Sequence, residues 1–219
     1  MTDKTEGISR QEVSIPADSV TLEGTLAVPK GTQALVVFAH GSGSSRHSRR
    51  NRFVAEVLHG RGIGTLLFDL LTAEEDTVYE NRFDIPLLAV RLIAATNWLK
   101  GLEQIVHFRI GYFGASTGAA AAIAAAADLG ARIGAVVSRG GHPDLAETAL
   151  PRMQAPTLLI VGGHDEVVLD LNRRAYQLIT AEKELKIVPG ATHLFEEAGA
   201  LEEVARLAAE WFRKYLLGR

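Results

Sequence analysis

The chain has 219 residues, a length that suits one domain or a domain with a small appendage. Hydrophobic residues make up 47% and charged residues 22%, as in ordinary soluble globular proteins, and the net charge of −3 gives no general reason to expect a nucleic-acid partner. Cysteine is absent, which excludes disulfides, thiolate metal sites and thiol nucleophiles and fits a reducing compartment.

The N-terminus is polar and mixed in charge and lacks the apolar core of a secretory signal, and residues 1–12 are expected to form a poorly ordered tail. The most apolar stretch, residues 114–127, is too short and too rich in alanine to span a bilayer. These features predict a cytoplasmic protein that is a monomer or a homodimer and has no membrane or nucleic-acid partner.

Two half-exposed strands come first in the chain. Apolar and polar residues alternate over residues 13–15 and 21–29, as in the strands of a hairpin. Short continuous apolar runs, typical of parallel strands that are buried on both faces, follow at residues 34–39, 64–68, 135–137 and 157–161. Weaker members of this set lie at 109–113 and 185–188.

Helical patterns fill the gaps between these strands. They cover residues 51–60, 86–100, 119–129, 171–179 and 201–217. Strands that alternate with helices imply βαβ units, so we predict an α/β fold with a mainly parallel, doubly wound sheet and helices on both faces. No repeat, low-complexity tail or linker interrupts the pattern, and residues 1–219 are expected to form one domain.

The strand ends carry the candidate functional residues, because open parallel sheets bind ligands beyond the carboxyl ends of their strands. Four of these ends carry, in chain order, a glycine-rich loop (residues 40–45, HGSGSS), a serine (114–118, GASTG), a carboxylate (162–166, GGHDE) and a histidine (189–193, PGATH). A serine, an acid and a histidine in this order are typical of the catalytic triad of an α/β-hydrolase.

Ser116 is the candidate nucleophile. It is the centre of a G-x-S-x-G motif between a predicted strand and a predicted helix, where a sharp turn exposes the hydroxyl and the flanking glycines avoid clashes. The motif alone is weak, and its place between strand and helix gives it weight. The competing interpretation is that Ser116 only caps the helix that follows.

His193 is the candidate base, because it alone of the seven histidines lies in the loop after the last strand, where the order Ser, Asp, His requires it. His40 is expected to brace its loop and His59 to be solvated on a surface helix. His142 lies near the rim of the predicted site and is a candidate substrate contact.

Asp165, 49 residues after Ser116 and 28 before His193, is the candidate acid that orients the imidazole. Asp144, in the loop after the preceding strand, is the second candidate. The alternative role for Asp165 is that of a turn or cap residue within the segment Gly-Gly-His-Asp.

The oxyanion of an acyl-transfer intermediate needs backbone N–H donors. Thr117, next to the nucleophile, should supply one, and the loop after the first buried strand should supply the other, most simply from Ser42, with Gly43 as the alternative. Neither glycine-rich loop matches a phosphate-binding P-loop, and no H-E-x-x-H or paired-carboxylate spacing indicates a metal. We therefore expect no cofactor and no metal ion.

Four segments carry a family resemblance, at residues 40–53 (HGSGSSRHSRRNRF), 111–122 (GYFGASTGAAAA), 158–168 (LLIVGGHDEVV) and 188–197 (VPGATHLFEE). Together they resemble the dienelactone hydrolase branch of the α/β-hydrolase superfamily, and most closely bacterial hydrolases that are sometimes fused to phosphoribosyltransferase-like domains. The resemblance covers nearly the whole chain.

This resemblance implies an eight-stranded sheet whose second strand is antiparallel, with Ser116, Asp165 and His193 as the triad. One departure matters. Dienelactone hydrolases proper use a cysteine nucleophile, and because the position here is a serine, dienelactone itself is a doubtful substrate.

The sequence leaves little room for a lid over the site. About 18 residues separate Ser138 from Thr157, enough for a loop and one short helix, so the pocket should be open. We therefore predict a serine hydrolase that cleaves small soluble carboxylic esters through an acyl-enzyme. Rival functions are acyl transfer, or thioester or peptide cleavage by the same triad, or a binding scaffold, natural or engineered, that keeps the fold without turnover.

A basic segment, residues 46–52, directly follows the predicted oxyanion loop. In the plain interpretation it is the solvated start of a surface helix. Positive charge in a first helical turn opposes the helix dipole, however, and a surface role does not explain that cost. The functional hypothesis is that Arg46, together with Arg139 at a neighbouring strand end, holds a substrate carboxylate beside the ester.

Overall fold

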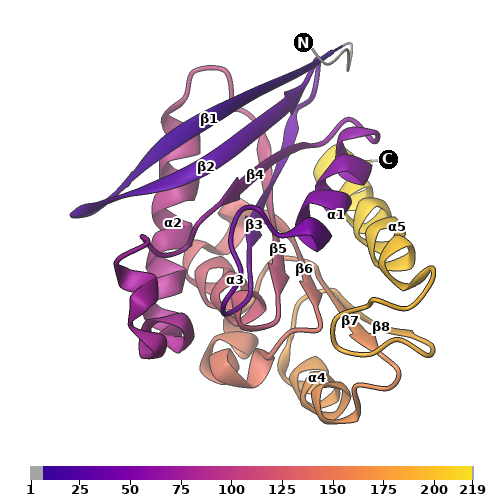
Figure 1. Ribbon diagram of the computed structural model, residues 1–219. Helices are drawn as coiled ribbons and strands as arrows, with labels where there is room; N and C mark the ends of the chain where they lie inside the picture. Colours follow the sequence, from indigo (N-terminus) through magenta and orange to yellow (C-terminus); the bar gives the residue numbers. More distant parts are fainter. Residues whose placement is uncertain (1–6, 219) are drawn as a thin grey trace.

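The computed structural model describes residues 7–218 (Figure 1). Its strands are β1 (Ile8–Ala17), β2 (Val20–Pro29), β3 (Ala34–Ala39), β4 (Gly64–Phe68), β5 (Arg109–Ala115), β6 (Ile133–Arg139), β7 (Thr157–Gly162) and β8 (Lys183–Val188). Its α-helices are α1 (Arg49–His59), α2 (Ile85–Gly101), α3 (Thr117–Leu129), α4 (Glu166–Leu178) and α5 (Ala200–Phe212), the last of which continues into a π-helical turn, Arg213–Leu217.

The strands form one sheet in the order β1-β2-β4-β3-β5-β6-β7-β8. From β4 to β8, every neighbouring pair is parallel, whereas β2 is antiparallel to both β1 and β4. This arrangement confirms the predicted mainly parallel, eight-stranded sheet with an antiparallel second strand.

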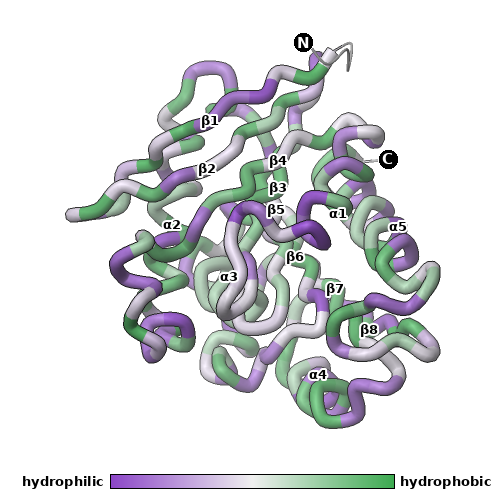
Figure 2. The backbone as a smooth tube through the Cα atoms, viewed as in Figure 1, coloured by the Kyte–Doolittle hydropathy of each residue, from purple (hydrophilic) through white to green (hydrophobic). Residues whose placement is uncertain are grey.

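Two hydrophobic cores lie on opposite faces of the sheet, because successive side chains of a strand point to opposite sides. Leu35 and Val37 of β3 belong to the core under α2 and α3, whereas Val36 and Phe38 belong to the core under α1 and α5. All four side chains are at most 1% exposed, and each contributes roughly 1.5–3 kcal/mol to stability through its burial. Figure 2 shows these central strands as hydrophobic and the start of α1 as hydrophilic.

The N-terminal hairpin corrects one expectation. Residues 8–12, predicted as part of a disordered tail, belong to β1 and pair with residues 25–29 of β2. Their side chains are mostly exposed and polar, so they lack the apolar alternation from which a strand is recognised. Residues 1–6 of the predicted tail lie outside the described residues.

The segment between β6 and β7 bears on access to the strand ends. It contains a kinked 3₁₀ segment, Pro143–Arg152, that packs against α3 and α4, and no large helical lid. Within residues 7–218, every helix is too short or too polar to cross a bilayer.

Candidate active site

Ser116 lies at the sharp turn between β5 and α3. Its φ of +52° and ψ of −123° are strained for a residue other than glycine. The chain can turn here because its neighbours are glycines: a Cβ on Gly114 would lie 2.4 Å from Ala119 Cα. A Cβ on Gly118 would lie 2.3 Å from the carbonyl oxygen of Ala39. Ser116 occupies the N-cap position of α3, but its side chain caps no backbone N–H, so its hydroxyl remains available for chemistry.

Side chains from three strand ends meet at this turn. Asp165 Oδ2 lies 2.7 Å from His193 Nδ1, and His193 Nε2 lies 3.3 Å from Ser116 Oγ. The side chain of Asp165 is only 14% exposed and that of His193 is 35% exposed. When Nδ1–H donates to the carboxylate, Nε2 is left free to accept a proton from the serine hydroxyl, which is the arrangement that activates a nucleophile.

Asp165 stands at the N-cap position of α4, directly after β7. Its side chain caps no backbone N–H of that helix, so the carboxylate serves His193 instead. Asp144, the second candidate acid, lies beside a different histidine, with Oδ1 3.7 Å from His142 Nδ1. The His142 ring in turn lies 5.9 Å from the His193 ring, measured between centroids.

The two predicted oxyanion donors lie together, and one of them is already engaged. Thr117 begins α3, and the first N–H groups of a helix have no intrahelical acceptor. The N–H of Ser42 donates a 2.8 Å hydrogen bond to Thr117 Oγ1. A Cβ on Gly41 would lie 3.1 Å from Ser116 Cβ, so a side chain at this position would crowd the serine.

His40 braces this loop, as predicted. Its Nε2 accepts a hydrogen bond of 3.1 Å from the N–H of Leu70, and its Nδ1 lies 3.0 Å from the carbonyl oxygen of Gly41. Burial lowers the pKa of His40, which favours the neutral imidazole that this pair of bonds requires.

The hollow in front of Ser116, here called the serine pocket, measures about 220 Å³. Arg139, at the end of β6, lines it and is 7% exposed. Within residues 7–218, its Nε and Nη1 are buried and have no hydrogen-bond partner. Burial, and to a lesser degree the charge of Arg50, lowers the pKa of Arg139 to about 10, so the guanidinium is still charged at neutral pH. The guanidinium carbon lies 5.8 Å from the centroid of the Phe195 ring, but no carboxylate within residues 7–218 pairs with it, so a cation without an ion-pair partner in that range faces the site.

Arg50 is a second basic residue of the serine pocket, and sequence reasoning did not single it out. Its Nη1 donates a 3.0 Å hydrogen bond to Glu196, while its Nε is buried without a partner in the described part of the chain. The basic pattern of residues 46–52 indicated that positive charge lies near the site, but it could not show which of these side chains lines the serine pocket.

Arg46 is placed differently from the prediction. Its guanidinium pairs with Asp69, and its backbone N–H donates a 2.7 Å hydrogen bond to the same carboxylate. Because Asp69 draws it away from Ser116, Arg46 does not line the serine pocket, and the hypothesis that it holds a substrate there is not supported by this placement. His142 is also outside the lining, although it stands beside His193.

His59, expected on the solvated side of its helix, is buried instead. Its Nε2 lies 2.7 Å from Thr65 Oγ1 of β4, because α1 packs against that strand. Within residues 7–218, histidine and acidic side chains nowhere gather in threes as the ligands of a metal ion would.

Comparisons with known proteins agree with this fold. A putative phosphoribosyl transferase of Mycobacterium tuberculosis is 58% identical over 208 residues, which are 95% of this chain and 47% of that protein. The chain thus spans about half the length of the curated relatives it matches, and their names describe longer proteins.

Solved structures of related proteins share the fold of this chain. A dienelactone hydrolase from Anabaena variabilis is 52% identical, covers 96% of this chain and 100% of its own, and superposes with a TM-score of 0.93. A cold-adapted esterase from an Arctic intertidal metagenomic library shares the fold at 18% identity, with coverage of 98% and 97% and a TM-score of 0.80. The family model described as "Dienelactone hydrolase family" matches residues 22–216. The chain belongs to the dienelactone hydrolase family.

Proposed function

We propose that the chain is a serine hydrolase that cleaves small carboxylic esters. Ser116 Oγ attacks the ester carbonyl while His193 takes the hydroxyl proton and then passes it to the leaving alcohol. Asp165 stabilises the imidazolium, and water activated by His193 then hydrolyses the acyl-enzyme. The observation that carries this proposal is the series Asp165–His193–Ser116, at 2.7 and 3.3 Å, on a strained nucleophile turn.

The oxyanion in this mechanism is held by backbone donors. Thr117 N–H, at the start of α3, gives one. Ser42 N–H gives the other by turning from the neutral hydroxyl of Thr117 to the developing negative charge, because hydrogen bonds to charged acceptors are roughly twice as strong as those to neutral ones.

A fluorophosphonate probe and p-nitrophenyl esters test this function. The probe should form one covalent adduct at Ser116, identified by peptide mass spectrometry, and the chain should hydrolyse p-nitrophenyl acetate. An unlabelled, inactive but folded protein would favour a binding scaffold instead.

Short acyl chains should be preferred. The serine pocket measures about 220 Å³, and no residue of the 3₁₀ segment Pro143–Arg152 lines it. We expect kcat/KM for p-nitrophenyl butyrate to exceed that for the palmitate ester by at least roughly tenfold. Rates measured on both sides of the micelle threshold should show no jump, because no lid has to open. A marked rise at the threshold would contradict the open pocket.

Arg139 selects the charge of the substrate in this proposal. Within residues 7–218, its buried Nε and Nη1 have no acceptor, and a buried charge that only an aromatic ring contacts is costly until an anion joins it. A carboxylate on the substrate would supply that anion through charge-assisted hydrogen bonds. The role assigned to Arg46 and Arg139 together in the sequence thus falls to Arg139, with Arg50 beside it.

The p-nitrophenyl half-ester of adipic acid and neutral p-nitrophenyl hexanoate test this selection. We expect kcat/KM to favour the half-ester by roughly 10–100-fold, and the preference to shrink as salt rises. Arg139→Met should remove the preference, spare the neutral ester and keep or raise Tm, since an unpaired buried charge is lost. Equal losses on both esters would mean that Arg139 only supports the pocket wall.

A further inference from the structure

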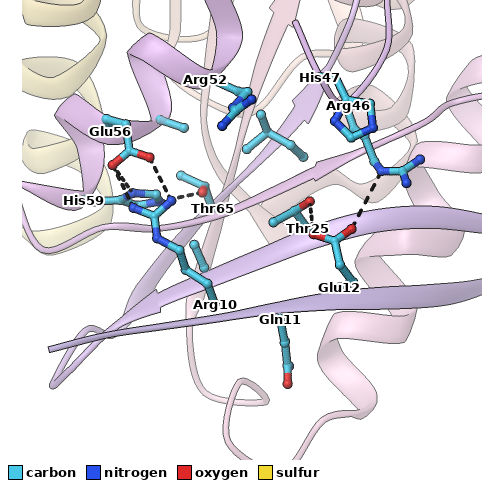
Figure 3. Close-up of a pocket in the computed structure, with 13 residues that line it drawn as sticks. Arg10, Gln11, Glu12, Thr25, Arg46, His47, Arg52, Glu56, His59 and Thr65 are labelled. Carbon is cyan, nitrogen blue, oxygen red and sulfur yellow. Dashed lines mark hydrogen bonds and ion pairs between the residues drawn. The ribbon is translucent and has the colours of Figure 1, made fainter. Parts of the chain in front are cut away.

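A second hollow, twice the size of the serine pocket, lies between the β1–β2 hairpin and α1 (Figure 3). This hairpin hollow measures about 450 Å³, which is within the usual range of small-molecule sites. None of the three proposed catalytic residues lines it. The start of α1 separates the two spaces: Ser48 and Asn51 line the serine pocket, whereas His47 and Arg52 line the hairpin hollow.

The acidic side chains of the hairpin hollow already have partners. Glu56 accepts two hydrogen bonds of 2.8 Å from Arg10, and these hold the pKa of Glu56 down to about 2. Glu12 accepts a 2.8 Å hydrogen bond from Thr25 Oγ1 and lies 3.9 Å from Arg46 Nε. These carboxylates therefore have little capacity left to attract a cation.

The basic side chains of residues 46–52 that line the hollow have fewer partners. Figure 3 shows Arg52, His47 and Arg46 along one side of the hollow. Within residues 7–218, the side chains of Arg52 and His47 make no hydrogen bond or ion pair. Arg46 pairs with Asp69, and its buried Nε forms no hydrogen bond within residues 7–218 but lies 3.9 Å from Glu12 Oε2.

The positive charges at the start of α1 also interact unfavourably with the helix dipole. The first turn of α1 contains no acidic residue, so Arg52 and its basic neighbours oppose the helix dipole without compensation in that turn. An anion in the hairpin hollow would offset this repulsion, and it would accept hydrogen bonds from the exposed side chains of Arg52 and His47, which are otherwise left to solvent.

The floor of the hairpin hollow is apolar and built from small side chains. Ala27 of β2 and Ala55 of α1 are 3% and 2% exposed, and Leu67 of β4 is 7% exposed. Two alanines at facing positions leave the space that larger residues would fill. At one end of the hollow, His59 Nε2 and Thr65 Oγ1 lie 2.7 Å apart and satisfy each other. These two buried atoms therefore need no hydrogen bond from a ligand.

We propose that the hairpin hollow is a second ligand site, separate from Ser116, that binds a small organic anion. A carboxylate or phosphate group lies at Arg52 and His47, where a guanidinium offers two parallel N–H donors to a planar or tetrahedral oxyanion. The apolar body of the ligand covers the small floor residues. This site does not depend on the proposed hydrolase activity.

A two-dimensional ¹H–¹⁵N NMR titration of the wild-type chain with phenyl phosphate, benzoate and benzyl alcohol tests the site. Both anions should give saturable shifts at the amides of Thr25, Ala27 and Leu67, and phenyl phosphate should bind more tightly because it carries more charge. Neutral benzyl alcohol should bind at least roughly tenfold more weakly. Shifts at Gly41 and Ser116 without saturable shifts at Thr25, Ala27 and Leu67 would place the anion in the serine pocket alone and overturn the proposal.

Two matched variants isolate the anchor. Arg52→Gln should weaken phenyl phosphate at least roughly tenfold, whereas Arg49→Gln, which removes the same charge from an exposed position of the same turn outside the lining, should change binding less than about twofold. Both positions are exposed, so both variants should keep the wild-type Tm. Equal losses in the two variants, or no saturable binding of either anion at about 10 mM, would overturn the proposal.

Discussion

Replacing Ser116 by alanine is expected to lower kcat for p-nitrophenyl acetate by roughly 10⁵–10⁶-fold. The hydroxyl is the only group lost, and its oxygen lies 3.3 Å from its proposed partner, His193 Nε2. Without it no acyl-enzyme can form, and only binding and the oxyanion donors remain to help water attack. Initial rates with purified protein at saturating substrate measure this loss.

The fold of this variant should be intact. Ser116 Oγ caps no helix, and alanine keeps the Cβ that the turn already accommodates, so Tm should change little. His193→Ala should cost about as much as Ser116→Ala, because residues that act as a unit give non-additive losses. Turnover close to wild type in either variant would rule out the proposed nucleophile and base.

Much of the sheet could be predicted because its central strands are buried on both faces. The apolar runs at β3 and β4 end where the strands end, at 34–39 and 64–68. The edge strand β8 begins at Lys183, two residues before the predicted start, because its outer side faces solvent and its first residues are polar. β1 was missed over residues 8–12 for the same reason.

The candidate site could be predicted where it depends on topology alone. Ser116, Asp165 and His193 each follow a parallel strand, and the carboxyl ends of parallel strands share one edge of the sheet, so their meeting follows from their order. Side-chain directions do not follow from order. Arg46 turns to Asp69, 23 residues further along the chain, and His59 turns to Thr65, because of tertiary contacts that no local pattern contains.

Asp165→Asn should lower kcat for p-nitrophenyl acetate by roughly 10⁴-fold. An amide has nearly the shape of the carboxylate, so the contact with His193 Nδ1, 2.7 Å in the wild type, can persist. Its NH₂ group can donate to Nδ1, however, which leaves the imidazole proton on Nε2. That nitrogen then cannot accept the proton of Ser116, and no negative charge stabilises the imidazolium.

Asp144→Asn is the matched control, since the same charge is removed from the only other acid at neighbouring strand ends that was a candidate for this role. Asp144 contacts His142 and not His193, so we expect less than about a fivefold change in kcat. Asp165 also stands at the N-terminus of α4, where losing a negative charge costs about 0.3–1 kcal/mol of stability. We therefore expect a small fall in Tm for Asp165→Asn whether or not Asp165 is catalytic. Only the change in kcat distinguishes a catalytic acid from a residue that merely stabilises the start of α4. If Asp144→Asn were the slower enzyme, the acid would lie one strand earlier, at the end of β6.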